Sequence, residues 1–187
     1  MQGLRSNTVR GRIRGWIEAH AAKLGDDVLE IGSRMHTPGA WWVNNRDLAC
    51  GSWLGMDMQP GHNVDAVCSV ETMPSDWAGR FSGVLCSEVL EHVSRPWEAL
   101  PKVRDVLRPG GWIVVTTLFS FPVHAFPSDF YRYTREGLHL LLADAGFDSI
   151  TTAYAGNVQY QLNDHGERGH TVRDAPMHVF AVAQRPC

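Results

Sequence analysis

The strongest constraint on the fold is a series of five short apolar runs, each almost unbroken and followed by turn residues or a helical pattern. Strands that are buried on both faces of a parallel sheet have this composition. The runs predict strands at 27–31 (DVLEI), 53–57 (WLGMD), 64–68 (VDAVC), 83–87 (GVLCS) and 112–118 (WIVVTTL), the last entered through a turn at RPGG.

Helical patterns flank and separate these runs. Apolar residues at helical spacing predict a helix at 8–24 that a glycine ends. A second helix is expected to begin near Trp97, so that Pro101 still falls in its first turn. Thr134 is typical of the N-cap of a third helix, and Gly146 is typical of its end.

Two further runs, 147–154 and 177–184, predict a final pair of strands. The stretch from Gly156 to Pro176 is long, polar and without a pattern, so we expect a loop there. Alternating strands and helices indicate an α/β fold. We therefore expect a Rossmann-like, doubly wound, mostly parallel sheet of about seven strands, with the last strand antiparallel and helices on both faces.

The composition excludes several classes of protein. Apolar residues make up 44% and charged residues 20% of the 187 residues, as in a single globular domain. No window approaches the roughly 18 unbroken apolar residues of a membrane helix, and no secretion signal is recognised. The net charge of −3 argues against a nucleic-acid-binding surface. The four cysteines form no CxxC pair, which favours free thiols and a cytoplasmic location.

Two acidic residues stand at the ends of neighbouring predicted strands. In an open α/β sheet, ligands bind at the carboxyl ends of the strands. An acid at such a strand end can accept hydrogen bonds from both hydroxyl groups of a ribose, and we assign this role to Asp57. A dinucleotide site requires G-x-G-x-x-G, but Gly32 is followed by no glycine before Gly39. Glu30 would also repel a pyrophosphate, whereas S-adenosylmethionine carries a positively charged amino group and sulfonium. The pattern favours this cofactor.

Several motifs then resemble, in order, those of the class I S-adenosylmethionine-dependent methyltransferases, closest to the small single-domain group. They are VLEIGSR, GMDMQPGHNVD, FSGVLCSEVLEHVSRPWEAL, VLRPGGWIVVTTLFSFPVHAFPSDFYRYTREGL and ADAGF, spread over about residues 27 to 150. The resemblance implies methyl transfer to an oxygen, nitrogen or carbon of a small-molecule, sugar or nucleotide-like acceptor, with S-adenosylhomocysteine as the product. It also implies which residues hold the cofactor: Glu30, Gly32 and Ser33 at the methionine end, Asp57 at the ribose, Met58, Ser69 and Val70 at the adenine, and Ser87 near the methyl group.

The acceptor side is expected in FPVHAFPSDFYRYT (121–134), which follows the fifth strand. His124 could act as a general base, because an unperturbed histidine titrates near pH 6.5. Asp129 could help remove the acceptor's proton, or could instead pair with Arg132 as a structural contact. We expect Glu88, His92, Tyr131 and Arg132 to contact the acceptor.

The segment EVLEH (88–92) also resembles a metal-binding motif. A di-iron bundle uses Glu-x-x-His and needs a second copy, which the chain lacks, so we expect no metal.

Two other functions remain open. One is a non-catalytic member of the same fold that binds the cofactor or acts as a scaffold. The other is a nicotinamide-dependent oxidoreductase, although Lys23 and Lys102 are the only lysines and form no Tyr-x-x-x-Lys motif. In the preferred interpretation, one domain spans 1–187, with a first helix (1–25), a cofactor-binding core (27–118) and an acceptor-side loop, helix and strand pair (119–187). The sequence does not set the oligomeric state.

Overall fold

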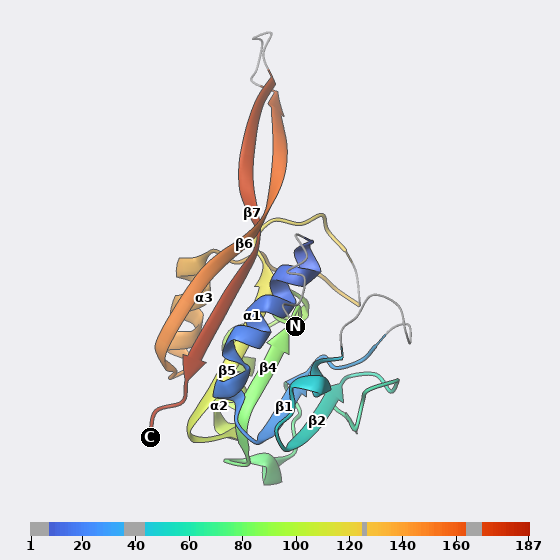
Figure 1. Ribbon diagram of the computed structural model, residues 1–187, viewed down its shortest axis with the longest axis vertical. Helices are drawn as coiled ribbons and strands as arrows, with labels where there is room; N and C mark the ends of the chain where they lie inside the picture. The colour runs from blue at the N-terminus through green and yellow to red at the C-terminus, as the bar shows by residue number, and fades with distance from the viewer. Residues whose placement is uncertain (1–7, 36–43, 125–126, 164–169) are drawn as a thin grey trace, which may run out of the picture.

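The computed structural model describes residues 8–35, 44–124, 127–163 and 170–187. Its centre is a seven-stranded sheet with the order β3-β2-β1-β4-β5-β7-β6 (Figure 1). β7 runs antiparallel to β5 and β6, and the other neighbouring pairs are parallel. The strands are β1 (Asp27–Ile31), β2 (Ser52–Asp57), β3 (Ala66–Val67), β4 (Phe81–Ser87), β5 (Leu107–Leu118), β6 (Asp148–Asn163) and β7 (His170–Gln184). The predicted fold class is confirmed.

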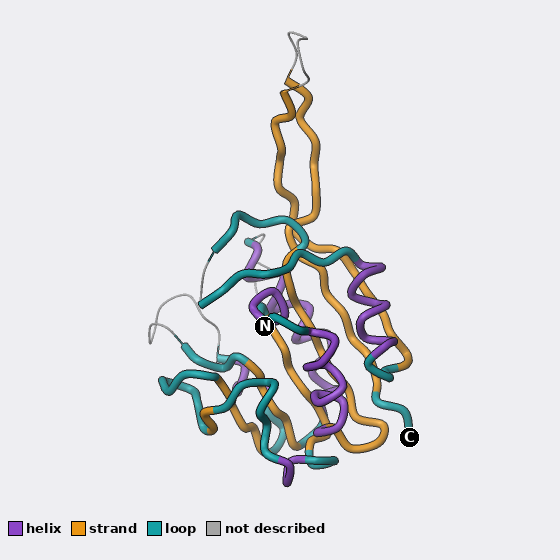
Figure 2. Tube along the Cα trace, turned by 180° about the vertical axis from the view of Figure 1, so that it is seen from behind, coloured by secondary structure: helices purple, strands orange, loops and turns teal. Residues whose placement is uncertain are grey.

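Helices cover both faces of the sheet (Figures 1 and 2). The α-helices are α1 (Val9–Leu24), α2 (Pro96–Val106) and α3 (Arg135–Asp144), and short 3-10 turns are η1 (Asn45–Leu48), η2 (Ser75–Trp77) and η3 (Leu90–His92). Alternate residues of β1 enter two separate cores. Val28 packs with Ile17 of α1, while Leu29 joins the larger core that contains Leu100 of α2 and Leu138 of α3. Each fully buried leucine contributes roughly 1.5–3 kcal/mol by leaving water, so both faces need their helices.

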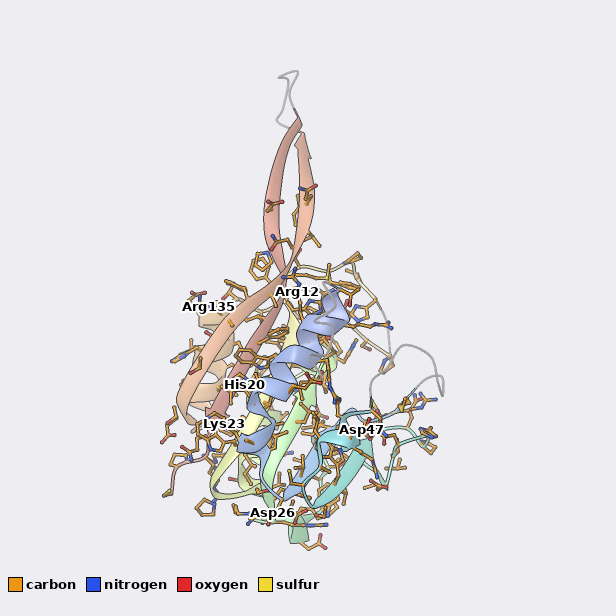
Figure 3. All side chains as sticks on the ribbon, in the orientation of Figure 1. Arg12, His20, Lys23, Asp26, Asp47 and Arg135 are labelled. Carbon is orange, nitrogen blue, oxygen red and sulfur yellow. The ribbon has the colours of Figure 1, made fainter. Side chains whose placement is uncertain are left out.

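The helix ends follow the local signals. The Thr134 hydroxyl accepts the Gly137 N–H at 2.9 Å and caps α3, as predicted. The helix predicted at 8–24 is observed as α1, with Gly25 directly after its last residue. Arg12 and Lys23 are exposed along α1 (Figure 3). None of the described helices is long and apolar enough to cross a membrane.

Three local predictions were wrong in detail. Helix α2 begins at Pro96, so Pro101 lies in its second turn and not its first. The burial of Leu100 and Val103 holds the helix there although Pro101 has no N–H to donate. RPGG is part of β5 and not a turn before it, because Gly110 N–H donates to the Arg185 carbonyl at 2.9 Å. The third strand is only Ala66–Val67, shorter than expected.

The stretch 156–176 is the largest correction, because most of it is strand and not loop. β6 and β7 stay paired from Asp148↔Gln184 to Asn163↔His170, and the pair extends well beyond the rest of the sheet (Figures 1 and 2). Val158 is half-buried between exposed Asn157 and Gln159, so a weak alternation is present. The segment is polar because no helix among the described residues covers this part of the ribbon, and each strand satisfies the backbone of the other.

Candidate functional site

The carboxyl ends of β1, β2 and β4 meet at one edge of the sheet, where Ile31 lies in register with Met56 on one side and Cys86 on the other. Beyond β1 the chain turns sharply, because Gly32 N–H and Ser33 N–H both donate to the Met56 carbonyl, at 2.9 and 3.0 Å. Gly32 has φ +74°, and a Cβ on it would lie within 3.0 Å of the Val89 side chain. The turn therefore requires glycine on two counts.

Asp57 ends β2 beside this turn. Its Oδ1 accepts the Gln59 N–H at 2.9 Å, and its Oδ2 lies 3.4 Å from Arg34 N, in the chain that follows β1. Next to it, Met58 is 57% exposed, which is unusual for a large apolar side chain. A fixed carboxylate with a free apolar surface beside it suits a ribose and an aromatic base.

Glu30 is buried, at 6% exposure, beneath the same turn. Its carboxylate accepts hydrogen bonds from Asn45 Nδ2 at 2.7 Å and from Trp53 Nε1 at 2.9 Å. Burial raises the pKa of Glu30, and these two hydrogen bonds offset part of that rise. The charge of Arg46 also lowers the pKa of Glu30, but the described residues form no ion pair with Glu30, so a cation from outside the protein would be favourable there. Sequence reasoning missed both donors, because neither follows a recognisable motif.

The other predicted cofactor residues already have partners within the protein. The Ser33 hydroxyl donates to the Asn63 carbonyl at 2.9 Å, and Ser69 Oγ accepts the Glu71 N–H at 3.2 Å. Val70 is partly buried against the larger core. Their cofactor contacts stay predictions.

The end of β4 carries two predicted site residues. Ser87 Oγ and Thr116 Oγ1 lie 2.8 Å apart in a hydrogen bond. Glu88 has φ +55°, a strained conformation for a residue with a side chain. Its Oε2 lies 3.1 Å from His178 Nε2, while its Oε1 is buried and makes no hydrogen bond among the described residues. His178, a histidine within an apolar strand, was not singled out from the sequence.

Glu91 follows on η3 and was not among the predicted site residues, although EVLEH contains it. Its side chain is almost fully buried, and Thr117 Oγ1 donates to its Oε2 at 2.8 Å. Burial, with a smaller contribution from the nearby charge of Glu88, raises the pKa of Glu91 to about 8.

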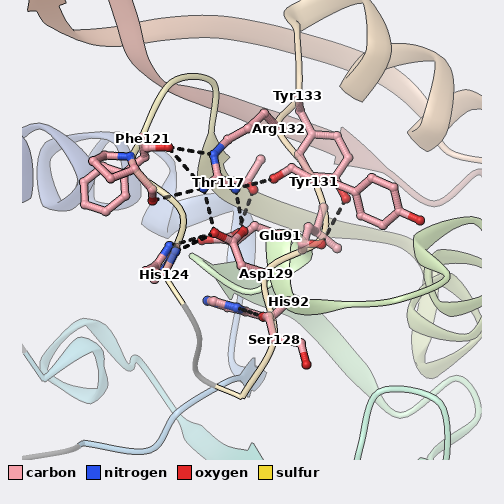
Figure 4. Close-up of polar contacts among 12 residues, drawn as sticks. Glu91, His92, Thr117, Phe121, His124, Ser128, Asp129, Tyr131, Arg132 and Tyr133 are labelled. Atoms are coloured by element: carbon pink, nitrogen blue, oxygen red, sulfur yellow. Dashed lines mark hydrogen bonds and ion pairs between the residues drawn. The ribbon is translucent and has the colours of Figure 1, made fainter.

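Two histidines lie beside Glu91 (Figure 4). His92 Nδ1 lies 2.5 Å from the Ser128 carbonyl, and the rings of His92 and His124 are 4.9 Å apart, edge to face. One oxygen or nitrogen atom from each of Glu91, His92 and His124 can be chosen so that all three lie within 4.8 Å of one another. The fold thus brings His124, from the loop after β5, to the end of β4.

Asp129 and Arg132 form an ion pair, which is the structural alternative to a role for Asp129 in removing the acceptor's proton. Arg132 Nη1 and Nη2 donate to Asp129 at 2.5 and 2.7 Å, and His124 N–H donates to the same carboxylate at 2.8 Å. Hydrogen bonding from Arg132 is the main cause that holds the pKa of Asp129 below its usual range. A carboxylate so held is a weak proton acceptor, which favours a positioning role. Tyr131 is tied elsewhere, since its hydroxyl donates to the Ser94 carbonyl at 2.9 Å.

Two surface hollows lie away from these side chains. Both lie beside α2, one lined by residues such as Met73 and Val106 and the other by residues such as Glu98. The segment 36–43, which follows the turn after β1, lies outside the described residues.

A family model described as a methyltransferase domain matches residues 7–152 of the chain. The curated ubiquinone biosynthesis O-methyltransferase of Paraburkholderia xenovorans is 33% identical over 115 residues, which cover 55% of this chain and 49% of that protein. The protein of the same name from Chromobacterium violaceum is 32% identical over 114 residues, with the same two coverages. The chain thus spans about half the length of the curated relatives it matches.

Solved structures share the fold at low identity. The 1,6-didemethyltoxoflavin-N1-methyltransferase of Burkholderia thailandensis, with bound 1,6-didemethyltoxoflavin and S-adenosylhomocysteine, has a TM-score of 0.65 and 14% identity, covering 96% of this chain and 80% of that one. A SAM-dependent methyltransferase from Archaeoglobus fulgidus has a TM-score of 0.62 and 14% identity, covering 94% of each chain.

Proposed function

The chain belongs to the methyltransferase domain family, and from this premise we propose that it transfers a methyl group from S-adenosylmethionine to a small-molecule acceptor. The observation that carries the proposal is the position of Asp57, held by backbone N–H groups beside the glycine turn that follows β1. A carboxylate at this place can accept both hydroxyl protons of a ribose.

The chain's own residues fit this cofactor. Asp57 would hold the ribose, and exposed Met58 would pack on the adenine. Gly32 lets the backbone approach the cofactor closely, since no side chain fits at its position. Buried Glu30 supplies a negative charge that no ion pair with another described residue neutralises, and it suits the amino group of the methionine end. A diphosphate would be repelled by the same charge, which disfavours a nicotinamide cofactor.

When bound, S-adenosylmethionine supplies a methyl group on a positively charged sulfur that is already a good leaving group. The protein then mainly has to align the acceptor with that methyl group, because orientation alone lowers such barriers by several kcal/mol. Ser87 and Glu88 at the end of β4, with His92 and His124 above them, form the acceptor side in our assignment. Asp129 positions His124, and Arg132 fixes Asp129.

A small-molecule acceptor is supported by the names of two similar proteins, a ubiquinone biosynthesis O-methyltransferase and a 1,6-didemethyltoxoflavin-N1-methyltransferase. A cytoplasmic location is part of the proposal and agrees with the cysteines, all four of which are free thiols.

Calorimetric titration with S-adenosylhomocysteine tests the cofactor site. Charge-assisted hydrogen bonds are worth about 1.5–3 kcal/mol, so Asp57→Asn should weaken binding by roughly 10- to 100-fold. Asp76→Asn changes an exposed acid on η2 and is the matched control, which should bind as wild type does. Equal affinity of Asp57→Asn and wild type, or tighter binding of a nicotinamide dinucleotide, would contradict the proposal.

A further inference from the structure

We propose that Glu91, His92 and His124 bind a divalent transition-metal ion at the acceptor side of the site. One potential ligand atom from each lies within 4.8 Å of the other two. Ligands around such an ion lie about 2 Å from it, so their mutual distances must shorten by an ångström or so. Rotations of exposed side chains supply movements of that size, and both histidines are half-exposed.

The hydrogen bond of His92 uses Nδ1 and leaves Nε2 free to bind a metal ion. A carbonyl oxygen can only accept, so the contact of 2.5 Å with the Ser128 carbonyl requires His92 Nδ1 to carry the hydrogen. The lone pair of a neutral His92 is then on Nε2. Metal-binding histidines regularly donate their second ring N–H to a backbone carbonyl or a carboxylate, because that contact fixes the ring and its tautomer.

A carboxylate lies against His124. Asp129 accepts the His124 backbone N–H, and its Oδ2 lies 3.2 Å from His124 Nδ1. The direction of that second contact is not that of a hydrogen bond, so Nδ1 is buried without a hydrogen-bond partner in the described part of the chain. Arg132 in turn fixes Asp129. The imidazole is therefore oriented by its surroundings and still has an unused ring nitrogen.

The local charge favours a cation. Glu91 is buried, and Thr117 supplies it with only a neutral hydrogen bond. Glu88 adds a second carboxylate close by, with an Oε1 that is buried and unpaired among the described residues. Arg132, whose charge acts on Glu91, already directs both terminal nitrogens at Asp129. A divalent ion would supply a counter-charge to the buried carboxylate of Glu91.

Two imidazole nitrogens and one carboxylate oxygen are ligands that suit Mn²⁺, Fe²⁺, Co²⁺ or Zn²⁺, and three protein ligands leave coordination positions open. The sequence predicted no metal because a second Glu-x-x-His is missing. The structure supplies the third ligand instead from His124, which the loop after β5 brings to EVLEH (Figure 4).

The ion also points to the class of acceptor, an inference that rests on the methyl transfer proposed above. A hydroxyl oxygen in an open coordination position would be acidified, as metal-bound water is. Its proton leaves to solvent, and the oxygen forms a bond to the methyl carbon. The carbon–sulfur bond breaks with its electron pair on sulfur, which yields a methyl ether and a neutral thioether. His124 would then act as a ligand and not as the base.

Titration of the tag-free, chelator-treated full chain with Co²⁺ tests the site, because the visible absorption of Co²⁺ reports its ligands. We expect one Co²⁺ per chain, and a loss of affinity of tenfold or more in His92→Gln and in Glu91→Gln. His139→Gln, on the exposed face of α3, is the matched control and should bind as wild type does. His92 is half-exposed, so its variant should fold even if the buried Glu91→Gln does not.

Absence of Co²⁺ binding by the wild type, or equal binding by wild type and His92→Gln, would overturn the metal site. Titration of the same samples with S-adenosylhomocysteine separates this failure from a failure of the proposed function. Cofactor binding without Co²⁺ binding would refute the metal site alone. Co²⁺ binding that is lost in His92→Gln would support the site whether or not the cofactor binds.

Discussion

Replacing Gly32 with alanine tests the turn on which the cofactor site depends. The substitution places a Cβ at φ +74° and within 3.0 Å of the Val89 side chain. The left-handed conformation costs about 1–2 kcal/mol for a residue with a side chain, and overpacking adds roughly 1–3 kcal/mol. Gly32→Ala should therefore lower the free energy of unfolding by about 2–5 kcal/mol. In a chain of this length, that loss lowers Tm by roughly 4–20 °C.

Two other glycines separate the two contributions. Gly79 also has a positive φ, +65°, but a Cβ added there would meet no atom within 4 Å. Gly79→Ala should therefore show the cost of the left-handed conformation alone. Gly15 lies within α1 with open space around it, and Gly15→Ala should stabilise the helix by about 0.5–1 kcal/mol. Urea denaturation measures the free energy of unfolding of all three glycine variants. Adding Val89→Ala to Gly32→Ala should restore only the part of the lost free energy that comes from overpacking. If Gly32→Ala cost no more than Gly79→Ala, the contact with Val89 would be refuted.

Three further predictions concern other parts of the chain. Because burial raises the pKa of Glu30 above 4.5, the folded protein keeps a proton that the unfolded chain has lost, and the free energy of unfolding should fall as pH rises from about 4.5 to the raised pKa. Urea titrations at a series of pH values should show that Glu30→Gln lacks this part of the pH dependence. Asp129→Asn should cost about 1.5–3 kcal/mol of unfolding free energy by weakening the contact with Arg132, whereas exposed Asp144→Asn should stay within about 0.5 kcal/mol; equal urea midpoints would contradict this. Replacing 159–174 with Asn-Gly should change Tm by less than about 4 °C in calorimetry, since this part of the hairpin pairs with itself; a larger loss would show that it supports the domain.

The order of the elements was predictable because it depends on short-range patterns. Continuous apolar runs marked the buried strands, and Thr134 marked a helix start whose capping bond is present. The position of Asp57 followed from the rule that parallel strands end at one edge. Pro101 was misplaced because a proline signal weighs against a helix locally, while the burial of Leu100 and Val103 acts through tertiary packing.

The sequence by itself determined the fold class and the two acids at the ends of β1 and β2, since residue periodicity and strand-end position are properties of a few neighbouring residues. Only the tertiary structure decided what those and other polar groups touch. Asn45 and Trp53 reach Glu30, and His124 comes to lie beside Glu91 and His92. These contacts join separate segments of the chain, and the one made by His124 exists only because the strand order places the loop after β5 against the end of β4. The length of the β6–β7 hairpin was decided in the same way, because a strand without a covering helix shows no apolar run and is recognised only by the partner that pairs with it.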